Sequence, residues 1–577
     1  MKTTTPLFLL LVTVGMLAAC GGSGGGGAGT TTPTTVPVTV PSAPADLAAT
    51  AGDGSVSLAF SAPASNGGAA ITGYTASCTS GSSTRATGGG TSPLVVTGLA
   101  NGTAYTCTVA ATNSAGTGAA ASVSVTPAGT IVAGSFRGNI VLGSPTASAV
   151  KANVFAQDQS GTAWISYGTS PDNYDRQTAT ATLSAAKPAE FSLDGLSANT
   201  RYYYRLYFQA AGESKAGPTS EYTFHTARPA GSTFTFTIQG DSHPERTNSQ
   251  FDAALYTRTL LTAAADRPDF HIASGDDFSV DTLDPSTITA AQVTGRYTLQ
   301  RPYLGLIGNS APVFLVNGNH EQAARYLLDG TPNNIAVWAQ TARNEYYPEP
   351  GPDGFYTGNT EQVPYIGLLR NYYAWTWGDA LFVVIDPYWS SSVAVDNVFG
   401  GSDKRLTMWD VTHGDSQYKW LKTTLEQSKA KYKFVFAHHV MGTGRGGIEL
   451  AHLWEWGGEN SKGVSEFATM RPTWPTPIHQ LMAANKVTIF FQGHDHVWVR
   501  QQLDGVTYQT LSEPADPNYS LFNSDAYTSG DKFPNTGYTR VKVSPSGVTV
   551  EYVRTYLPKD EVPGKTSGTA AFSYTIQ

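Results

Sequence analysis

Five short apolar runs between residues 234 and 491 each lead directly into a cluster of aspartate, asparagine or histidine residues. The segments between these runs are long enough for helices, so the pattern predicts strands alternating with helices, as in an α/β domain. In α/β sheets, ligands bind beyond the carboxyl ends of the strands. The five clusters should therefore meet at one site, although they are spread along the chain from residue 241 to residue 496.

The clusters contain six of the eleven histidines of the chain, a density that predicts a metal site. Carboxylate, amide and imidazole donors suit borderline or hard metal ions, and without cysteine the clusters cannot form a soft thiolate site. The clusters are Gly240-Asp241-Ser242-His243, Gly275-Asp276-Asp277, Asn317-Gly318-Asn319-His320-Glu321, His438-His439 and Gly493-His494-Asp495-His496.

The order of these clusters resembles that of the calcineurin-like metallophosphoesterase family. With the β-rich segment in front of it, the region 234–577 is most similar to the purple acid phosphatase branch. The resemblance implies a β-sheet sandwich flanked by helices, with two bound metal ions (Fe, Zn or Mn). It assigns one ion to Asp241, His243, Asp276 and His496, and the other to Asp276, Asn319, His438 and His494.

The resemblance also implies the reaction, which is hydrolysis of phosphate monoesters by attack of a metal-bridging hydroxide on phosphorus. His320 would protonate the leaving alkoxide, a role that suits imidazole because its pKa lies near operating pH. A phosphodiesterase or nucleotidase with the same metals is one alternative. Another is a surface binding protein with a vestigial metal domain, although a complete ligand set argues against it.

One position departs from the purple acid phosphatases. Their second motif supplies a tyrosinate ligand three residues after the shared aspartate, where this sequence has Ser279. His243 offers a ligand from the first cluster instead. We therefore expect no purple colour, and the resemblance leaves open whether one ion is ferric and whether the pH optimum is acidic, because both depend on the ligand set.

Two further residues near the clusters are candidates for substrate contacts. His439 follows the predicted ligand His438 and could be a substrate contact or a wall of the pocket. Arg445, in a glycine-rich loop, could clamp a phosphate through two parallel hydrogen bonds. The alternative for Arg445 is an ordinary solvated loop residue.

Two β-rich segments, residues 43–128 and 132–228, precede the α/β part. Both contain the frame Gly-Leu-x-x-x-Thr-x-Tyr, at residues 98–105 and 195–202, as expected for two β-sandwiches. The first resembles a fibronectin type III domain, in which the frame's tyrosine bonds to upstream backbone, and the second resembles the N-terminal sandwich of purple acid phosphatases. We expect Trp164 in the core of the second. Aromatic residues here are expected to pack internally, and a polysaccharide or cell-surface partner is the alternative.

The N-terminus carries a targeting pattern, with Lys2 followed by an apolar run too short to span a bilayer. Residues 17–20 resemble the lipobox of bacterial lipoproteins, so residues 1–19 would be a signal peptide and Cys20 the lipidated residue. Residues 20–42 have the composition of a flexible linker. We therefore expect an exported lipoprotein of the cell envelope or surface, attached to the membrane by its lipid only. An ordinary secretory peptide is the alternative.

The two remaining cysteines, Cys78 and Cys107, should pair in an oxidising location because the sandwich framework places both on strands. The formal net charge of −8 excludes a basic surface that could coat nucleic acid.

Overall fold

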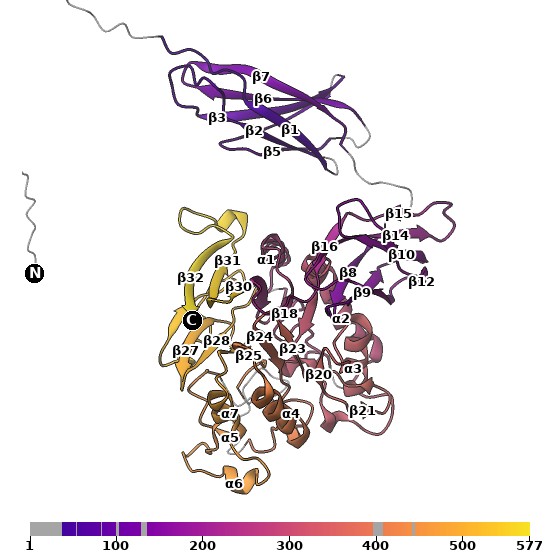
Figure 1. Ribbon diagram of the computed structural model, residues 1–577, viewed down its shortest axis with the longest axis vertical. Coiled ribbons are helices and arrows are strands. Elements are labelled where there is room, and N and C mark those ends of the chain that lie inside the picture. The colour runs from indigo at the N-terminus through magenta and orange to yellow at the C-terminus, as the bar shows by residue number, and fades with distance from the viewer. Residues whose placement is uncertain are drawn as a thin grey trace, which may run out of the picture. The chain divides into compact units, whose positions relative to one another are not determined.

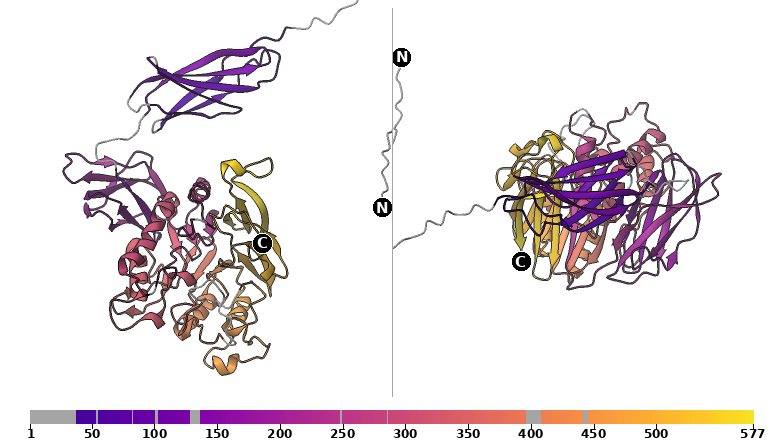
Figure 2. Two further views of the ribbon diagram at one scale, coloured as in Figure 1. Left: turned by 180° about the vertical axis from the view of Figure 1, so that it is seen from behind. Right: turned by 90° about the horizontal axis from the view of Figure 1, so that it is seen from above.

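The computed structural model describes residues 37–52, 55–81, 83–99, 103–127, 136–247, 249–284, 286–395, 408–440 and 445–577. The predicted lipidation site Cys20 lies outside these residues. The chain divides into two compact units, Met1–Gly129 and Thr130–Gln577. Figures 1 and 2 show the strand-rich first unit and the larger second unit, which contains all the helices among the described residues.

The first unit is a β-sandwich of a three-stranded sheet, β1-β2-β5, and a four-stranded sheet, β4-β3-β6-β7. Buried and less buried residues alternate along its strands, as expected when one face of each sheet packs on a shared core. Cys78 and Cys107 lie opposite each other on β3 and β6 and form a disulfide. The strands are β1 (Ala45–Gly52), β2 (Ser55–Ser61), β3 (Gly73–Ser80), β4 (Ser83–Gly89), β5 (Leu94–Thr97), β6 (Tyr105–Asn113) and β7 (Gly116–Val125).

A second β-sandwich begins the second unit, with one sheet built on β10 and β14 and the other ordered β13-β9-β8. Tyr202 is the tyrosine of the repeated Gly-Leu-x-x-x-Thr-x-Tyr frame. Its hydroxyl accepts a hydrogen bond of 2.9 Å from the backbone N–H of Ser197, so the bond to upstream backbone that is typical of this frame is present in this sandwich. The strands are β8 (Gly138–Gly143), β9 (Ala149–Ala156), β10 (Gly161–Gly168), β11 (Arg176–Gln177), β12 (Ala181–Leu183), β13 (Pro188–Asp194), β14 (Arg201–Ala210), β15 (Gly217–Pro218) and β16 (Tyr222–His225).

The expected core position of Trp164 is wrong. Along β10, Ala163, Ile165 and Tyr167 point into the core, and the alternation of the strand places Trp164 on the opposite face. There Trp164 is half-buried and stacks on Tyr207, with ring centroids 5.4 Å apart.

The rest of the second unit contains two large sheets. The six-stranded sheet has the order β19-β18-β17-β30-β31-β32, and the eight-stranded sheet has the order β20-β23-β24-β25-β26-β28-β27-β29. The strands of the first are β17 (Phe234–Gln239), β18 (His271–Ala273), β19 (Val313–Leu315), β30 (Gly537–Ser544), β31 (Gly547–Arg554) and β32 (Thr569–Ile576). Those of the second are β20 (Thr357–Gly358), β23 (Tyr373–Trp377), β24 (Ala380–Val384), β25 (Tyr432–Phe436), β26 (Ile489–Gln492), β27 (Trp498–Leu503), β28 (Val506–Thr510) and β29 (Asp531–Phe533). A separate hairpin pairs β21 (Gln362–Val363) with β22 (Gly367–Leu368).

Helices cover the outer faces of both sheets, so this region has four layers (Figure 1). Strand β24 shows the arrangement, because Phe382 and Val384 pack between the sheets while Leu381 and Val383 pack against α4 and α7. Helices α2 and α3 cover β18 and β19. The helices are α1 (Ala253–Ala265), α2 (Ala290–Gly308), α3 (Ile335–Tyr346), α4 (Gly414–Gln427), α5 (Trp454–Gly457), α6 (Phe467–Met470) and α7 (Ile478–Ala484).

Arg301 of α2 forms hydrogen bonds between this four-layered region and the second sandwich. The side chain of Arg301 is fully buried, and its guanidinium donates hydrogen bonds to Asn139 Oδ1 (2.7 Å) and to the backbone carbonyls of Asn153 (2.9 Å) and Tyr346 (2.5 Å). Asn139 and Asn153 belong to the sandwich, so a buried cation of one domain is satisfied by acceptors of the other.

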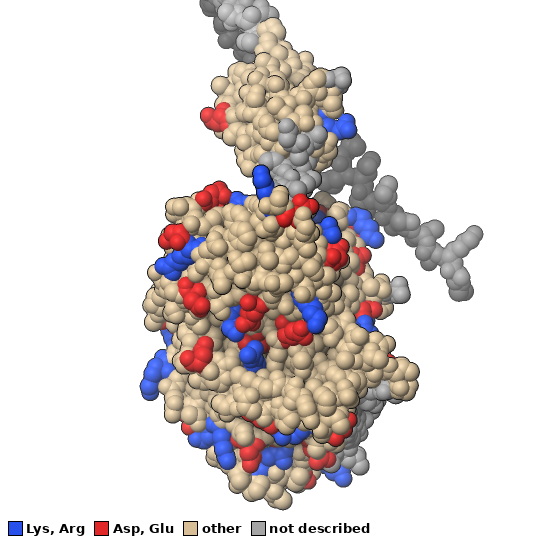
Figure 3. Space-filling model, turned by 90° about the vertical axis from the view of Figure 1, so that its right-hand side faces the viewer, with Lys and Arg blue, Asp and Glu red and all other residues tan. Residues whose placement is uncertain are grey.

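Among the described residues, no helix combines the length and the apolar character needed to cross a membrane. On the face shown in Figure 3, Lys and Arg side chains lie among Asp and Glu side chains, and uncharged residues form most of the surface. This distribution agrees with the low share of charged residues, 14% of the chain.

Candidate metal centre

The five clusters meet where strands of both large sheets end. Strands β17, β18 and β19 run parallel in one sheet, and β25 and β26 run parallel in the other. The clusters of Asp241, Asp276 and Asn319 follow the first three strands, and those of His438 and His494 follow the other two. Their donor atoms form overlapping groups in which all ligand atoms lie within 4.8 Å of one another.

One group consists of Asp241, His243 and His496. Asp241 Oδ2 lies 3.0 Å from His496 Nε2 and 3.9 Å from His243 Nε2. All three side chains are buried, with exposed fractions of at most 5%. Two imidazole nitrogens therefore face one carboxylate oxygen among buried side chains.

The adjoining group contains Asp276 and His438, which also approach Asp241. Asp276 Oδ2 lies 2.9 Å from His438 Nε2, and Asp241 Oδ2 lies 3.9 Å from the same nitrogen. Asn319 Oδ1 lies 3.1 Å from His494 Nδ1. All seven residues that the sequence assigned to the metals are thus brought into one cluster.

These residues fit metal ions in two respects. His243 Nε2 is buried without a hydrogen bond to any described residue, a costly state unless another group binds it, while Asp241 Oδ2 and His438 Nε2 have only the ion-pair contacts given above. The carboxylates also favour positive charge between them. Burial would lower the pKa of His438, but Asp276 and Asp241 raise the pKa to about 10. Oxygen and nitrogen donors of this kind bind Fe, Zn or Mn.

The backbone around the cluster is held in unusual conformations. Four of the seven residues have positive φ angles: His243 (42°), Asp276 (56°), His494 (67°) and His496 (56°). Non-glycine residues adopt this region at some cost in energy, and they do so most often at functional sites. Glycine is required at Gly493, because a Cβ atom there would lie 2.4 Å from Asp241 Oδ1.

Comparison with protein families agrees with this geometry. Residues 234–498 match the family described as calcineurin-like phosphoesterase, and residues 42–127 match the fibronectin type III domain. Residues 234–498 form a metallophosphoesterase domain. No curated protein matches the chain in sequence.

A solved structure supports the fold of the second unit. A purple acid phosphatase isolated from yellow lupin (Lupinus luteus) seeds is similar with a TM-score of 0.50 and 13% identity, over 90% of this chain and 92% of that chain. The anchor in the inner membrane complex of Plasmodium matches with a TM-score of 0.30 and 11% identity, over 60% of this chain and 88% of that chain. The likeness to the lupin phosphatase concerns the fold alone.

Ser279 of the metallophosphoesterase domain stands where the purple acid phosphatases have their tyrosinate. Its hydroxyl lies 3.1 Å from His243 Nδ1, and Glu245 Oε1 lies 3.3 Å from the same nitrogen. A ring with partners at Nδ1 presents Nε2 to a metal ion. The serine at this position therefore orients the extra histidine of the first cluster.

Several carboxylates that support the site were not assigned a role from the sequence. Glu513 Oε1 lies 3.0 Å from His496 Nδ1, and it follows β28, far from any cluster in sequence. Glu321 is fully buried and accepts hydrogen bonds from the backbone N–H groups of residues 276, 277, 278 and 318. Of these two, only Glu321 could have been recognised from the sequence as part of the site, since it stands in the third cluster.

His320 lies at the edge of the metallophosphoesterase centre, with 12% of its side chain exposed. Its Nε2 is 3.6 Å from Asp276 Oδ2 and 3.4 Å from Arg246 Nη2, while its Nδ1 is 2.6 Å from Asp281 Oδ2. The ring is therefore oriented by Asp281 and turns its other nitrogen toward the carboxylate of Asp276.

The two candidate substrate contacts both lie against His494. His439 is buried, stacks on His494 with ring centroids 4.1 Å apart, and has Nδ1 2.6 Å from the hydroxyl of Tyr388. Arg445 donates a hydrogen bond of 2.6 Å to the backbone carbonyl of His494 and lies 3.4 Å from Asp495. Arg445 thus supports the loop of His494, which occupies part of its donor capacity.

Proposed function

We propose that the chain hydrolyses phosphate monoesters at a centre of two metal ions. The observation that carries this proposal is the convergence of seven candidate metal ligands from five loops, among them the buried His243 Nε2, which has no hydrogen bond to a described residue. The likeness of the fold to a purple acid phosphatase supports the same reaction class.

The side chains divide into two sets around a shared carboxylate. Asp276 belongs to both sets, because its donor atoms group with His243 and His320 as well as with Asp241 and His438. Asp241, His243 and His496 would complete one ion's ligands, and Asn319, His438 and His494 the other's. Bound metal ions would supply the activated water and the positive charge that transfer of a phosphoryl group requires.

His320 would donate the proton that the leaving oxygen needs. Its Nε2 faces the cluster and its Nδ1 is held by Asp281, so a proton carried on Nε2 points toward the place where an ester would bind. Arg246, 24% exposed and beside the same nitrogen, is positioned to bind a phosphoryl oxygen.

The test uses the purified full-length chain. Metal content is measured together with the rates on 4-nitrophenyl phosphate and on bis(4-nitrophenyl) phosphate, before and after treatment with a chelator. We expect about two metal ions per chain, faster hydrolysis of the monoester, and loss of activity on chelation that added metal restores. A faster rate on the diester would show a phosphodiesterase, and no hydrolysis by a metal-loaded protein would contradict the proposal.

A further inference from the structure

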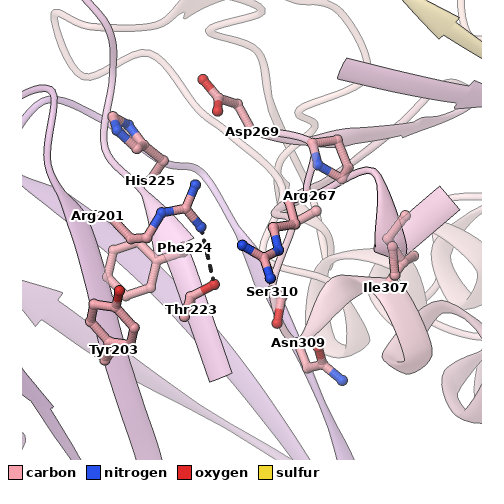
Figure 4. Close-up of a pocket in the computed structure, with 13 residues that line it drawn as sticks. Arg201, Tyr203, Thr223, Phe224, His225, Arg267, Asp269, Ile307, Asn309 and Ser310 are labelled. Atoms are coloured by element: carbon pink, nitrogen blue, oxygen red, sulfur yellow. Dashed lines mark hydrogen bonds between the residues drawn. The ribbon is translucent and has the colours of Figure 1, made fainter. Parts of the chain in front are cut away.

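A cavity of about 420 Å3 lies between the second sandwich and the metallophosphoesterase domain (Figure 4). The sandwich contributes residues of β14 and β16, and the catalytic domain contributes the segments 264–269 and 307–311. A volume of this size falls in the range of small-molecule sites.

The cavity is separate from the metal centre. Its catalytic-domain wall consists of residues that directly precede β18 and β19, whereas the clusters of Asp276 and Asn319 follow the same strands. The cavity and the metal centre therefore lie at opposite ends of these strands, and none of the seven metal-binding residues lines the cavity.

Two guanidinium groups from different domains enter this cavity. Figure 4 shows the side chains of Arg201 and Arg267 pointing toward one another, with the hydroxyl of Thr223 between them. Arg201 makes one long hydrogen bond of 3.4 Å to Thr223 Oγ1, and Arg267 makes no side-chain hydrogen bond or ion pair with any described residue. Like charges that converge in this way are stabilised by an anion between them.

The acidic group in the wall does not supply that anion. Asp269 accepts hydrogen bonds from both Arg228 Nε and Arg228 Nη2, and a third of 2.9 Å from Trp377 Nε1. Its charge is therefore already balanced by Arg228. Arg201, which is half-buried, and Arg267, which is exposed, have no acidic partner among the described residues and lie beside the buried imidazole of His225.

The backbone of Arg267 gives an independent reason to assign a role to its side chain. Arg267 follows the C-cap residue of α1 and has a φ of 51°, a left-handed conformation that helices usually reserve for glycine or asparagine. An arginine at this position costs energy that a glycine would avoid. A ligand-binding role for the side chain would explain why arginine occupies this strained position.

We propose that this cavity binds a small molecule carrying a phosphate group. Two guanidinium forks provide enough donors for the several oxygens of a tetrahedral dianion, whereas a carboxylate is saturated by one fork. Phe224, Tyr203 and Ile307 line the rest of the cavity and would contact an organic portion of the ligand. The site is independent of the proposed hydrolysis.

The experiment measures the number of phosphate ions bound per chain of the metal-loaded, full-length protein, by equilibrium dialysis with radiolabelled inorganic phosphate. The variants are Arg267→Gly, which also relieves the positive φ, and Arg201→Lys, which keeps the charge but removes the fork. Arg137→Ala is the matched control, because it removes an exposed arginine of the same sandwich whose partner, Asp158, is also exposed. Thermal unfolding should show Arg267→Gly to be at least as stable as the wild type.

We expect the wild type and Arg137→Ala to bind one more equivalent of phosphate than Arg267→Gly, and Arg201→Lys to bind that equivalent about tenfold more weakly. The difference of one equivalent is expected whether or not the metal centre itself binds phosphate. If the apolar walls contact the ligand, phenylphosphonate should displace this equivalent of phosphate at a lower concentration than sulfate does. Equal binding by the wild type and Arg267→Gly would overturn the proposal, and displacement by acetate as effective as by sulfate would overturn the assignment to a tetrahedral anion.

Discussion

Asp281 Oδ2 lies 2.6 Å from Nδ1 of His320 and so fixes the ring whose other nitrogen faces the metal cluster. Burial would lower the pKa of His320, but the charges of Asp276 and Asp281 raise it to about 9. The two carboxylates therefore favour the protonated form of the ring. This arrangement is suited to an acid that protonates a leaving group.

The first prediction concerns that proton. We expect His320→Ala to retain both metals and to lose about 10²–10⁴ in kcat for alkyl phosphates, whose leaving groups need protonation. The loss should be much smaller for 4-nitrophenyl phosphate, because nitrophenolate leaves without a proton. Metal analysis and both rates are measured on one preparation.

The control is His452→Ala, which removes an exposed histidine outside the clusters. It should change neither rate. Loss of a metal ion from His320→Ala would instead show that His320 is a ligand or a support of the ligands. Equal slowing of both substrates with the metals retained would assign His320 to binding of the phosphoryl group.

Asp281 gives a second prediction, because it positions His320 without facing the cluster itself. In Asp281→Asn the amide keeps the size of the side chain but not its charge. We expect a loss of about tenfold on alkyl phosphates, smaller than that of His320→Ala, with the rate on the nitrophenyl ester almost unchanged. If both esters slow to the same extent, Asp281 has a general structural role.

The shared carboxylate gives a third prediction. Asp276→Ala should lose metal affinity and activity together, each by at least about 10²-fold. Changes to residues that only support a metal ligand already lower metal affinity or activity by about 10–100-fold. Asp158→Ala, an exposed carboxylate of the second sandwich, is the control. Full metal content in Asp276→Ala would contradict the assignment of this residue to both ions.

The disulfide of the first unit gives a fourth prediction. Replacing both Cys78 and Cys107 by alanine should destabilise that unit by about 2–4 kcal/mol, since the bond restricts the unfolded chain. Hydrolysis should be unaffected, because the seven candidate metal ligands all belong to the second unit. Chemical denaturation followed separately for the isolated first unit and for activity of the full chain distinguishes the two effects.

The lipobox pattern gives a fifth prediction, which the described residues do not reach. If Cys20 is lipidated, the wild-type protein should fractionate with membranes, and Cys20→Ser should be released or left unprocessed. Mass spectrometry of the N-terminal peptide checks the modification directly. A wild-type protein found only in the soluble fraction, with Cys20 unmodified, would refute the anchor.

The cluster at the strand ends could be predicted from sequence because parallel strands bring their carboxyl ends to one edge, whatever the length of the chain between them. This rule accounts for Asp241 and Asp276, which follow neighbouring parallel strands of one sheet. His438 follows a strand of the other sheet, so its approach to Asp241 also depends on how the two sheets pack on each other, which the rule does not predict.

The supporting residues could not be predicted in the same way. Glu513 reaches His496 only because β28 lies beside β26 in the sheet, a pairing with no local sequence signal. Trp164 was misplaced because an alternating strand does not by itself reveal which face is buried. Its small and apolar neighbours Ala163 and Ile165 fill the core.

The buried guanidinium of Arg301 has an evolutionary consequence. A rearranged gene that kept the catalytic region but lost residues 136–228 would leave this cation without the acceptors of Asn139 and Asn153. Such a protein would leave the guanidinium with the carbonyl of Tyr346 as its remaining acceptor among the described residues and would expose to water the surface that the sandwich covers. The second sandwich and the catalytic region should therefore be inherited as a single module, and natural recombination should separate them only where position 301 has changed as well.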